Sequence, residues 1–294
     1  MAAAGLAACC LVLALWAVVR DRHTESSRAV SSVLLQEGKN QAVTAGEPAS
    51  APRAGARPSM VSVDTPLAAC EGRIERQAQR LPTVAIVGAS YTAGTGPNNP
   101  QLSWAVDLAW LLHWNAVIYG VTGAGYVRAG SGGHGPMARM LAHEGLHGLG
   151  PALVIVQAGH DDIGVPLGSE AGRVRTTMSL IHQAAPNARI GLLTTFAATP
   201  GGTPALHQTD HTIVATGRAA DSHVIIMDPL AGHWSFPRAA GNVLHPTAAG
   251  DEWIAQKVAA TLRGHGMEPA AATSTTPVIC DVSVGGGKPA SATA

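Results

Sequence analysis

The sequence predicts an α/β fold: a three-layer α/β/α sandwich with a five-stranded parallel sheet of the flavodoxin-like kind. Three observations lead to this prediction. From Leu81 onward, short apolar stretches alternate with longer helix-like stretches. The apolar stretches are hydrophobic at nearly every position, which is typical of strands that are buried on both faces. The stretches between them are long enough to form the helices that connect parallel strands.

The expected elements follow in chain order. A short polar helix is predicted over Glu71–Arg80, and the β-branched run Thr83–Val87 then forms the first strand and stops at a glycine. The later strands have the same apolar character and are predicted over Ala116–Val121, Ala152–Gln157, Ile190–Phe196 and His223–Met227. The remaining helices are predicted over Gln101–His113, Pro136–Glu144, Ser169–Ala185, Pro204–Ala219 and Ala249–Arg263. In such a sheet, ligands bind in the loops that follow the carboxyl ends of the strands.

Composition divides the chain into four expected segments. Residues 1–22 are expected to be an apolar signal peptide or membrane anchor, and residues 23–69 a flexible linker rich in Ala, Pro and Ser. Residues 70–264 form the expected folded domain. Residues 265–294 are rich in Gly and Thr, and we expect an irregular tail that is tied back through Cys280.

The apolar segment bears on localisation. Ala2–Val19 contains no charged side chain, and its length is close to the ~20 residues that span a bilayer. It lacks the basic start and the nearby cleavage site of a typical signal peptide. We therefore expect either membrane anchoring through residues 2–19 or a signal peptide, and a secreted or membrane-anchored protein that works outside the cytoplasm.

Four cysteines are present. Cys9 and Cys10 belong to the apolar segment, whereas Cys70 and Cys280 lie on either side of the expected domain. The latter two are either a disulfide that ties both ends of the domain together or two unrelated free thiols. Their bracketing position favours the disulfide, which requires an oxidising compartment.

Charge limits the classes of partner. The formal net charge is zero and the sequence pI is about 7.2. Because the chain has no basic stripe, we expect no nucleic-acid partner. A weakly charged surface also does not steer strongly charged substrates over long distances.

The most informative feature is a serine at the end of the first strand, matched by a histidine late in the chain. Residues 88–94 read GASYTAG and residues 242–246 read NVLHP. A serine hydroxyl is a weak nucleophile until a base takes its proton, and histidine is the usual base near neutral pH. The sequence therefore predicts Ser90 as a nucleophile and His245 as its base. The alternative for Ser90 is a helix N-cap, which is common after a strand.

These segments resemble the SGNH (GDSL-type) hydrolase family, and the match spans Val84 to Ile254. Its first block, G-D-S-x-T-x-G, is matched by GASYTAG except at Ala89, and Gly123 matches the glycine of the second block. The third block, G-x-N-D, is matched by GHDD with Asp161 at the Asn position. The last block, D-x-x-H-P, is matched by NVLHP with Asn242 at the Asp position.

The resemblance implies a function and a set of site residues. It implies a serine hydrolase that cleaves carboxylic esters of small acyl groups, lipids or acylated glycans through an acyl-enzyme, with no cofactor. Together with the apolar N-terminal segment, this leads us to expect an exported enzyme. Ser90 and His245 would form a dyad, or a triad with Asn242. The oxyanion hole would use the backbone N–H groups of Ser90 and Gly123 together with the side chain of Asp161. Trp234 and Phe236 are candidates for lining an acyl or sugar pocket.

Two block positions leave alternatives open. An ionised Asp161 offers only acceptors and would repel an oxyanion, so it can donate only when protonated. Asn242 can hold the histidine through its side-chain oxygen, or a backbone carbonyl near Ser235–Phe236 can replace it. The second hypothesis is therefore a catalytically weak or inactive SGNH-fold protein that binds a cell-envelope glycan or an acyl ligand.

A competing motif is HEGLH at residues 143–147, which satisfies the H-E-x-x-H pattern of zinc metallopeptidases. That pattern needs one continuous helix, but Gly145 lies inside it and Gly148, Gly150 and Pro151 follow directly. A zinc metallopeptidase is therefore a remote alternative, and the primary expectation is that no metal is bound.

Overall fold

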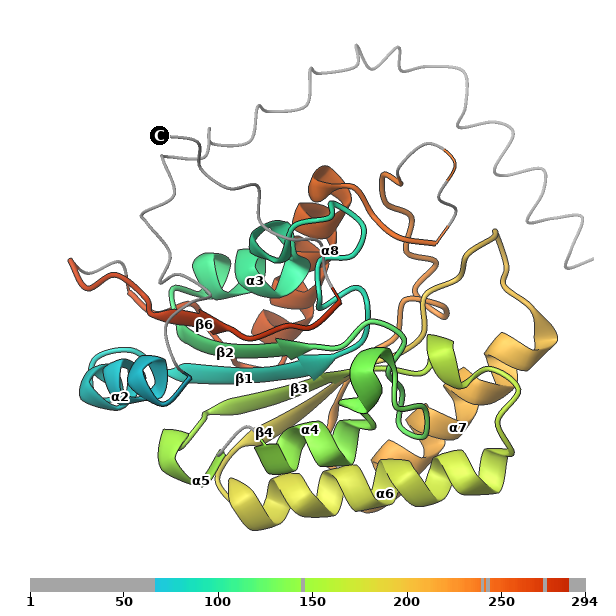
Figure 1. The fold of residues 1–294 in the computed structure, drawn as a ribbon, viewed down its shortest axis with the longest axis horizontal. Coiled ribbons are helices and arrows are strands. Elements are labelled where there is room, and N and C mark those ends of the chain that lie inside the picture. The colour runs from blue at the N-terminus through green and yellow to red at the C-terminus, as the bar shows by residue number, and fades with distance from the viewer. Residues whose placement is uncertain (1–66, 144–145, 239–240, 242–243, 272–273, 286–294) are drawn as a thin grey trace, which may run out of the picture. The chain divides into compact units, whose positions relative to one another are not determined.

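The structure is a computed structural model that describes residues 67–143, 146–238, 241, 244–271 and 274–285. Six parallel strands form one sheet in the order β5-β4-β3-β1-β2-β6 (Figure 1). The strands are β1 Thr83–Gly88, β2 Asn115–Gly120, β3 Leu153–Gln157, β4 Arg189–Leu193, β5 Ile225–Met227 and β6 Ile279–Asp281. The parallel sheet is confirmed, and its first five strands have the flavodoxin-like order 2-1-3-4-5.

The predicted number of strands is wrong, because β6 adds a sixth beside β2. It lies in the segment that the sequence predicts to be an irregular tail. Three residues are too few to show the hydrophobic periodicity by which strands are predicted from sequence. This segment becomes a strand through its contacts with residues far away in the chain. Asn115 Oδ1 accepts the N–H of Val278 at 3.0 Å, and Ser283 Oγ accepts the N–H of Gly120 at 2.8 Å.

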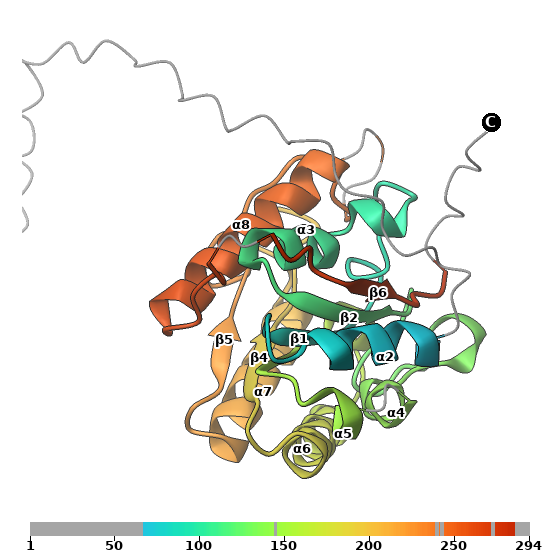
Figure 2. The ribbon, with the colours of Figure 1, turned by 90° about the vertical axis from the view of Figure 1, so that its left-hand side faces the viewer.

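Helices cover both faces of the sheet, as the three-layer prediction requires. Helices α3 and α8 pack together on one face, and α4, α6 and α7 lie on the other (Figures 1 and 2). Helix α2 packs against β2, β6 and α5. The helices are α2 Leu67–Gln77, α3 Trp104–Leu112, α4 Met137–His143, α5 Leu146–Leu149, α6 Leu167–Ala184, α7 Pro204–Ala220 and α8 Ala248–Gly264. The 3-10 turns are η2 Pro100–Leu102, η3 Ser131–Gly133 and η4 His160–Asp162.

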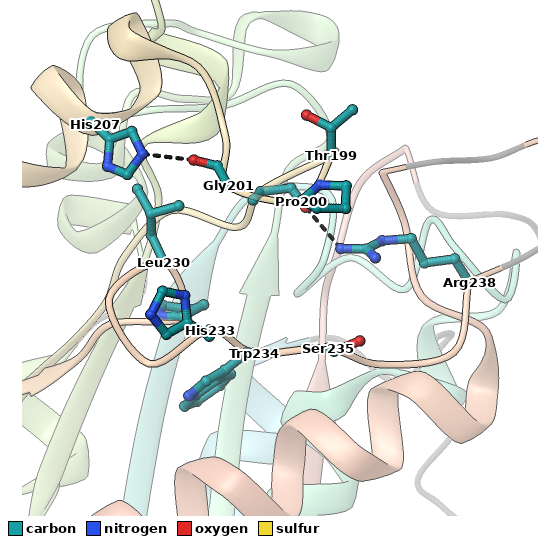
Figure 3. A pocket seen from close by; sticks show the side chains of 11 residues that line it. Thr199, Pro200, Gly201, His207, Leu230, His233, Trp234, Ser235 and Arg238 are labelled. Carbon is teal, nitrogen blue, oxygen red and sulfur yellow. Dashed lines mark hydrogen bonds between the residues drawn. The ribbon is translucent and has the colours of Figure 1, made fainter. Parts of the chain in front are cut away.

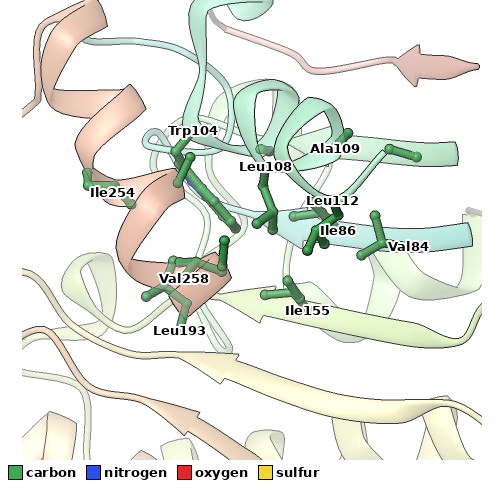
Figure 4. Packing of buried hydrophobic residues seen from close by; sticks show 14 of the residues in the cluster. Val84, Ile86, Trp104, Leu108, Ala109, Leu112, Ile155, Leu193, Ile254 and Val258 are labelled. Carbon is green, nitrogen blue, oxygen red and sulfur yellow. The ribbon is translucent and has the colours of Figure 1, made fainter. Parts of the chain in front are cut away.

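The strands are apolar throughout because each contributes to two cores. Successive side chains of a strand point to opposite faces. Accordingly, Val84 and Ile86 join the cluster under α3 and α8, whereas Ala85 and Val87 join the cluster under α4 and α6. Figure 4 shows the first cluster, in which Trp104 of α3 lies between the sheet and α8.

Short polar contacts fix the start of α8, which lies close to the predicted base. Thr247 is its N-cap and accepts the N–H of Gly250 at 3.2 Å. Four residues later, Asp251 Oδ1 accepts the N–H of Trp104 at 3.0 Å, which ties the start of α8 to the start of α3. The loop that carries His245 therefore ends at a fixed point in the core.

Among the described residues, no helix is long and apolar enough to cross a membrane. Residues 2–19 lie outside that part of the chain, so the expected anchor or signal peptide stays a prediction.

The predicted disulfide is present. Cys70 of α2 and Cys280 of β6 are bonded across a sequence separation of 210 residues. Both are buried in a small cluster with Ile74, Val117 and Val278. The bond therefore holds α2 and the last strand against the same edge of the sheet.

We expect Cys280→Ser to lower the free energy of unfolding by about 2–5 kcal/mol, because the unfolded chain gains freedom when this long loop opens. Urea denaturation of the full-length chain measures the change. Cys70→Ser should give the same loss, and the double variant no further loss. Equal stability of wild type with and without reductant would contradict the prediction.

Candidate active site

The candidate site lies where the carboxyl ends of three neighbouring strands meet. Gly88 at the end of β1 pairs with Gly120 of β2 and with Gln157 of β3. The three loops that follow therefore begin side by side. The connection after β1 leads to β2 on one side of β1, whereas β3 lies on the other side. The direction in which strands are added therefore reverses at β1, and open α/β sheets form a ligand-binding crevice at such a position.

The turn after β1 is held by a residue that the motifs do not single out. Gln157 Oε1 accepts the N–H of Ala89 at 3.0 Å and the hydroxyl of Thr92 at 3.0 Å. Gly88 has no room for a side chain, because a Cβ there would overlap Thr92. The sequence does carry one sign of this role: Gln157 is a polar residue at the end of the otherwise apolar strand LVIVQ.

The structure brings Ser90 and His245 together. His245 Nε2 lies 2.8 Å from Ser90 Oγ, although 155 positions separate the two residues. Ser90 is only 4% exposed, and His245 is half-buried. A hydroxyl and an imidazole at this distance can exchange a proton.

Tyr91, the residue after the candidate nucleophile, positions the histidine loop. Its hydroxyl donates to the carbonyl of Leu244 at 2.6 Å, and its ring centroid lies 5.5 Å from that of His245. Phe196 stacks on the Tyr91 ring at 4.2 Å. Tyr91 occupies a variable position of the first block, so the motif predicts no role for it.

Two effects favour the neutral form of His245. Burial lowers its pKa below the ordinary value of 6.5, and the charge of nearby His160 lowers it further. His160 Nδ1 lies 3.2 Å from the carbonyl oxygen of Phe196. A lowered pKa keeps the imidazole able to accept a proton under mildly acidic conditions.

Two backbone donors at this edge are free to bind a ligand. Within the described part of the chain, neither the Ser90 N–H nor the Gly123 N–H donates a hydrogen bond. Gly123 has φ +79°, a conformation that L side chains rarely adopt, which explains the glycine. Both groups match the predicted oxyanion donors, whose role stays a prediction.

Asp161, the predicted third oxyanion donor, lies on η4 after β3 and is partly exposed. Burial raises its pKa above the ordinary value, the positive charge of His160 opposes this rise, and the negative charge of Asp162 adds to it. A raised pKa extends the pH range in which the side chain keeps its proton. No hydrogen bond from this side chain to Ser90 or His245 is present.

Asp162 fixes the loop that carries Gly123. Its fully buried carboxylate accepts the backbone N–H groups of Tyr126, Val127 and Arg128 at 2.5, 3.2 and 3.0 Å. Gly125 must be a glycine, because a Cβ there would overlap this carboxylate. Asp162 therefore acts as a clamp between the loops after β2 and β3.

Behind this clamp lies a second buried carboxyl group, Glu170 of α6. It is fully buried, and neither of its oxygens has a hydrogen-bond partner among the described residues. Burial raises its pKa to about 8, and the negative charges of Asp162 and Asp210 contribute to the rise. Glu170 is therefore mostly neutral at pH 7, which relieves the repulsion on the charged clamp.

Two predictions fall on parts of the chain that are not described. Asn242 lies outside the described residues, so its place as third member of a triad stays a prediction. In HEGLH, α4 ends at His143, α5 begins at Leu146, and Glu144 and Gly145 also lie outside the described residues. No group of three or more His, Cys, Asp or Glu among the described residues is placed to hold a metal ion.

Two cavities are present among the described residues. One, of about 260 Å³, lies beyond the ends of β4 and β5 and is lined partly by Trp234, whereas Phe236 is buried in the core beneath α8. Of the two aromatic candidates, Trp234 therefore lines this cavity and Phe236 does not. The other, of about 380 Å³, is lined by α2, α3 and the segment before β6, and none of the predicted site residues lines it.

Comparison with known proteins identifies relatives in sequence. The GDSL-like lipase/acylhydrolase family matches residues 86–253. A GDSL lipase of Mycobacterium tuberculosis is 31% identical over 192 residues, which cover 61% of this chain and 81% of that protein.

Solved structures share the fold. A family two carbohydrate esterase from Clostridium thermocellum, in complex with cellohexaose, is 16% identical with a TM-score of 0.50 over 63% of this chain and 65% of that one. A family two carbohydrate esterase from Cellvibrio japonicus is 16% identical, with a TM-score of 0.51 over 63% and 61%. A salicylyl-acyltransferase from a tetracycline biosynthetic pathway is 15% identical, with a TM-score of 0.52 over 65% and 56%. The chain thus spans less than two thirds of each.

We expect Asp162→Asn to lower the free energy of unfolding by about 2–4 kcal/mol, because the amide removes one acceptor and points its own N–H groups at backbone donors. Hydrogen exchange at Tyr126, Val127 and Arg128 should accelerate. Glu252→Gln, on the exposed side of α8, removes the same charge and should change neither quantity. Unchanged exchange at these three amides in Asp162→Asn would show that the carboxylate does not hold the loop.

Proposed function

This chain belongs to the GDSL-like lipase/acylhydrolase family, and we propose that it hydrolyses carboxylic esters with Ser90 as nucleophile and His245 as general base. The observation that carries the proposal is the 2.8 Å separation of His245 Nε2 from Ser90 Oγ. The backbone N–H groups of Ser90 and Gly123, which donate to no acceptor in the described part of the chain, support it, because acyl transfer needs donors for the negative oxygen that develops.

In the proposed mechanism, Ser90 Oγ attacks the acyl carbon while His245 Nε2 takes its proton. The carbonyl oxygen becomes negative and accepts hydrogen bonds from the N–H groups of Ser90 and Gly123. The ester bond then breaks, and the alcohol leaves with the proton from His245. Water then attacks the acyl carbon while His245 takes its proton. The bond between Ser90 Oγ and the acyl carbon breaks, His245 returns the proton to Ser90 Oγ, and the carboxylic acid leaves.

Asp161 is the proposed third donor in its protonated form. Partial burial supports this role, because it favours the neutral carboxyl group. At higher pH the ionised side chain would repel the oxyanion, and a missing donor costs about 10²–10³ in rate at comparable sites. Asn242 is proposed to accept the second ring N–H of His245 and so hold the useful tautomer.

The substrate class is proposed from the family and its relatives. Small acyl, lipid and acylated-glycan esters all fit a family of lipases and acylhydrolases. Two structural neighbours are carbohydrate esterases by name, which supports including glycan esters in the tests. No nucleic-acid partner is proposed.

Action outside the cytoplasm is part of the proposal. The apolar run at residues 2–19 supports export through a signal peptide or membrane anchoring, and the Cys70–Cys280 disulfide supports an oxidising compartment. Fractionation of cells that produce the full chain tests this, because a reduced protein found only in the cytosol would contradict it.

A second candidate function is a weak or inactive member of the family that binds a cell-envelope glycan or an acyl ligand. The observation that favours it is the carboxyl group of Asp161 where the family has an amide. Large activity gained by Asp161→Asn with Asn242→Asp in an otherwise inert protein would support this function. Ordinary esterase rates in wild type would exclude it.

We expect Ser90→Ala to lower turnover of short p-nitrophenyl esters by at least about 10³-fold, because no other group can form the acyl-enzyme. A fluorophosphonate probe should label the wild-type full-length chain and not this variant. Ser169→Ala removes an exposed hydroxyl on α6 and should behave as wild type. A folded wild type that neither turns over esters nor is labelled would defeat the proposal.

The proposed roles also predict a bell-shaped pH profile. The reaction needs neutral His245, whose pKa is lowered, so activity should rise with a midpoint below pH 6.5. It also needs protonated Asp161, whose pKa is raised from 3.8, so activity should fall again as that group ionises. The result is an optimum set by the two midpoints, with the acid limb assigned to His245 and the alkaline limb to Asp161.

Asp161→Asn should remove the alkaline fall and raise kcat by up to about 10²–10³-fold at pH 8, because the amide donates at every pH. Measurement of kcat between pH 4 and 9 in both proteins is the test. The same alkaline fall in the variant, or a lower rate throughout, would show that Asp161 is not the donor.

A further inference from the structure

The cavity of about 260 Å³ beyond β4 and β5 lies near the candidate site, and the proposed mechanism does not use it. It is lined by the loop after β4, the start of α7 and the loop after β5 (Figure 3). Its volume corresponds to about nine water molecules at ~30 Å³ each. That is enough for a headgroup or a single sugar and too little for a long acyl chain.

The lining of this cavity carries positive charge and no negative charge. Its residues are Ala197, Thr199, Pro200, Gly201, His207, Pro229, Leu230, His233, Trp234, Ser235 and Arg238. None of these side chains is acidic. Arg238 supplies a permanent positive charge, and two histidines lie on the other side of the opening (Figure 3).

The guanidinium of Arg238 is held in place without an anionic partner. One nitrogen, Nη2, donates to the carbonyl of Ala197 at 2.8 Å, and the group lies 4.3 Å from the ring centroid of Phe236. Arg238 forms no ion pair within the described part of the chain, and its buried Nε has no acceptor there. A half-buried charge of this kind is stabilised when a ligand brings the opposite charge.

Short connections link the cavity to the candidate active site. Arg238 forms a β-bridge with Pro246, the residue after His245. On the opposite wall, Ala197 follows Phe196, which stacks on Tyr91 beside Ser90. Both walls of the cavity are therefore continuous with the residues that position the nucleophile and its base.

We infer that this cavity binds an anionic group of the ester substrate, a carboxylate or a phosphate, through Arg238. The inference rests on the proposed function and narrows its substrate class. A planar guanidinium forms paired hydrogen bonds with either anion, whereas an alkyl chain would remove water from Arg238 and the histidines and replace none of their hydrogen bonds. Trp234 and Leu230 supply apolar walls for the carbon skeleton that carries the charge.

Competition against a neutral ester tests this inference on the full-length chain. Turnover of p-nitrophenyl acetate is measured with glycerol 3-phosphate or glycerol, and with glucuronate or glucose. In wild type, each anion should inhibit at a concentration at least about tenfold lower than its neutral counterpart, as one charge-assisted hydrogen bond predicts. The stronger of the two anions identifies phosphate or carboxylate as the group bound. The difference should shrink as NaCl is added.

Variants of Arg238 separate the effect of its charge on anion binding from the effect of its packing. Arg238→Met keeps most of the stem and should abolish the preference for anions, whereas Arg238→Lys should retain a reduced preference. Arg175→Gln, on the exposed side of α6, removes an equal charge and should leave the preference unchanged. Equal inhibition by charged and neutral compounds in wild type would overturn the inference. So would a preference that survives in a folded Arg238→Met protein.

Failure of the anion-site inference can be told apart from failure of the proposed hydrolase function. If wild type neither hydrolyses p-nitrophenyl acetate nor reacts with a fluorophosphonate, the proposed hydrolase is wrong. Calorimetric titration of glycerol 3-phosphate and glycerol into wild type and Arg238→Met then tests, without any need for activity, whether the cavity binds an anion. Binding of the phosphate that is lost in the variant supports the anion site, and no binding to wild type overturns it.

Discussion

The parallel pairing of β1 with β2 on one side and β3 on the other is the constraint on which the candidate site depends. Parallel strands end at the same edge, so the turn with Ser90, the loop with Gly123 and the turn with Asp161 must begin as neighbours. Side chains then lock these loops together. Gln157 holds the turn after β1, and Asp162 holds the loop after β2. The sheet thus brings the three loops close together, and buried polar contacts fix their positions.

Burial of this edge also sets its electrostatics. Removal from water disfavours charge, which explains both the lowered pKa of His245 and the raised pKa of Asp161. Asp162 stays tied to three backbone N–H groups, while neighbouring Glu170 is mostly neutral at pH 7. Burial therefore favours a neutral base and a carboxyl group that can donate. It raises the pKa of Asp162 as well, and the three backbone N–H groups oppose that rise.

Most of the fold and the two reactive residues could be predicted from the sequence, but the residues that hold them in place could not. The four ordered blocks gave Ser90 and His245, and the apolar runs gave five strands. Tyr91, Gln157 and Arg238 were missed, because their roles depend on partners that lie 41 to 153 positions away. The strand β6 was missed because its three residues acquire a strand conformation only by pairing with β2.

The sequence by itself determined the α/β class, the parallel sheet and the identity of the candidate nucleophile and base, and it favoured the Cys70–Cys280 pair that the structure then showed. Periodicity, glycine positions and block order are local properties, so they can be read along the chain. Only the tertiary structure decided which backbone N–H groups stay open among the described residues and which carboxyl groups lose water. It also decided that Arg238, which forms no ion pair in that part of the chain, faces a cavity near the site. Those properties depend on packing between distant segments, and no local pattern records them.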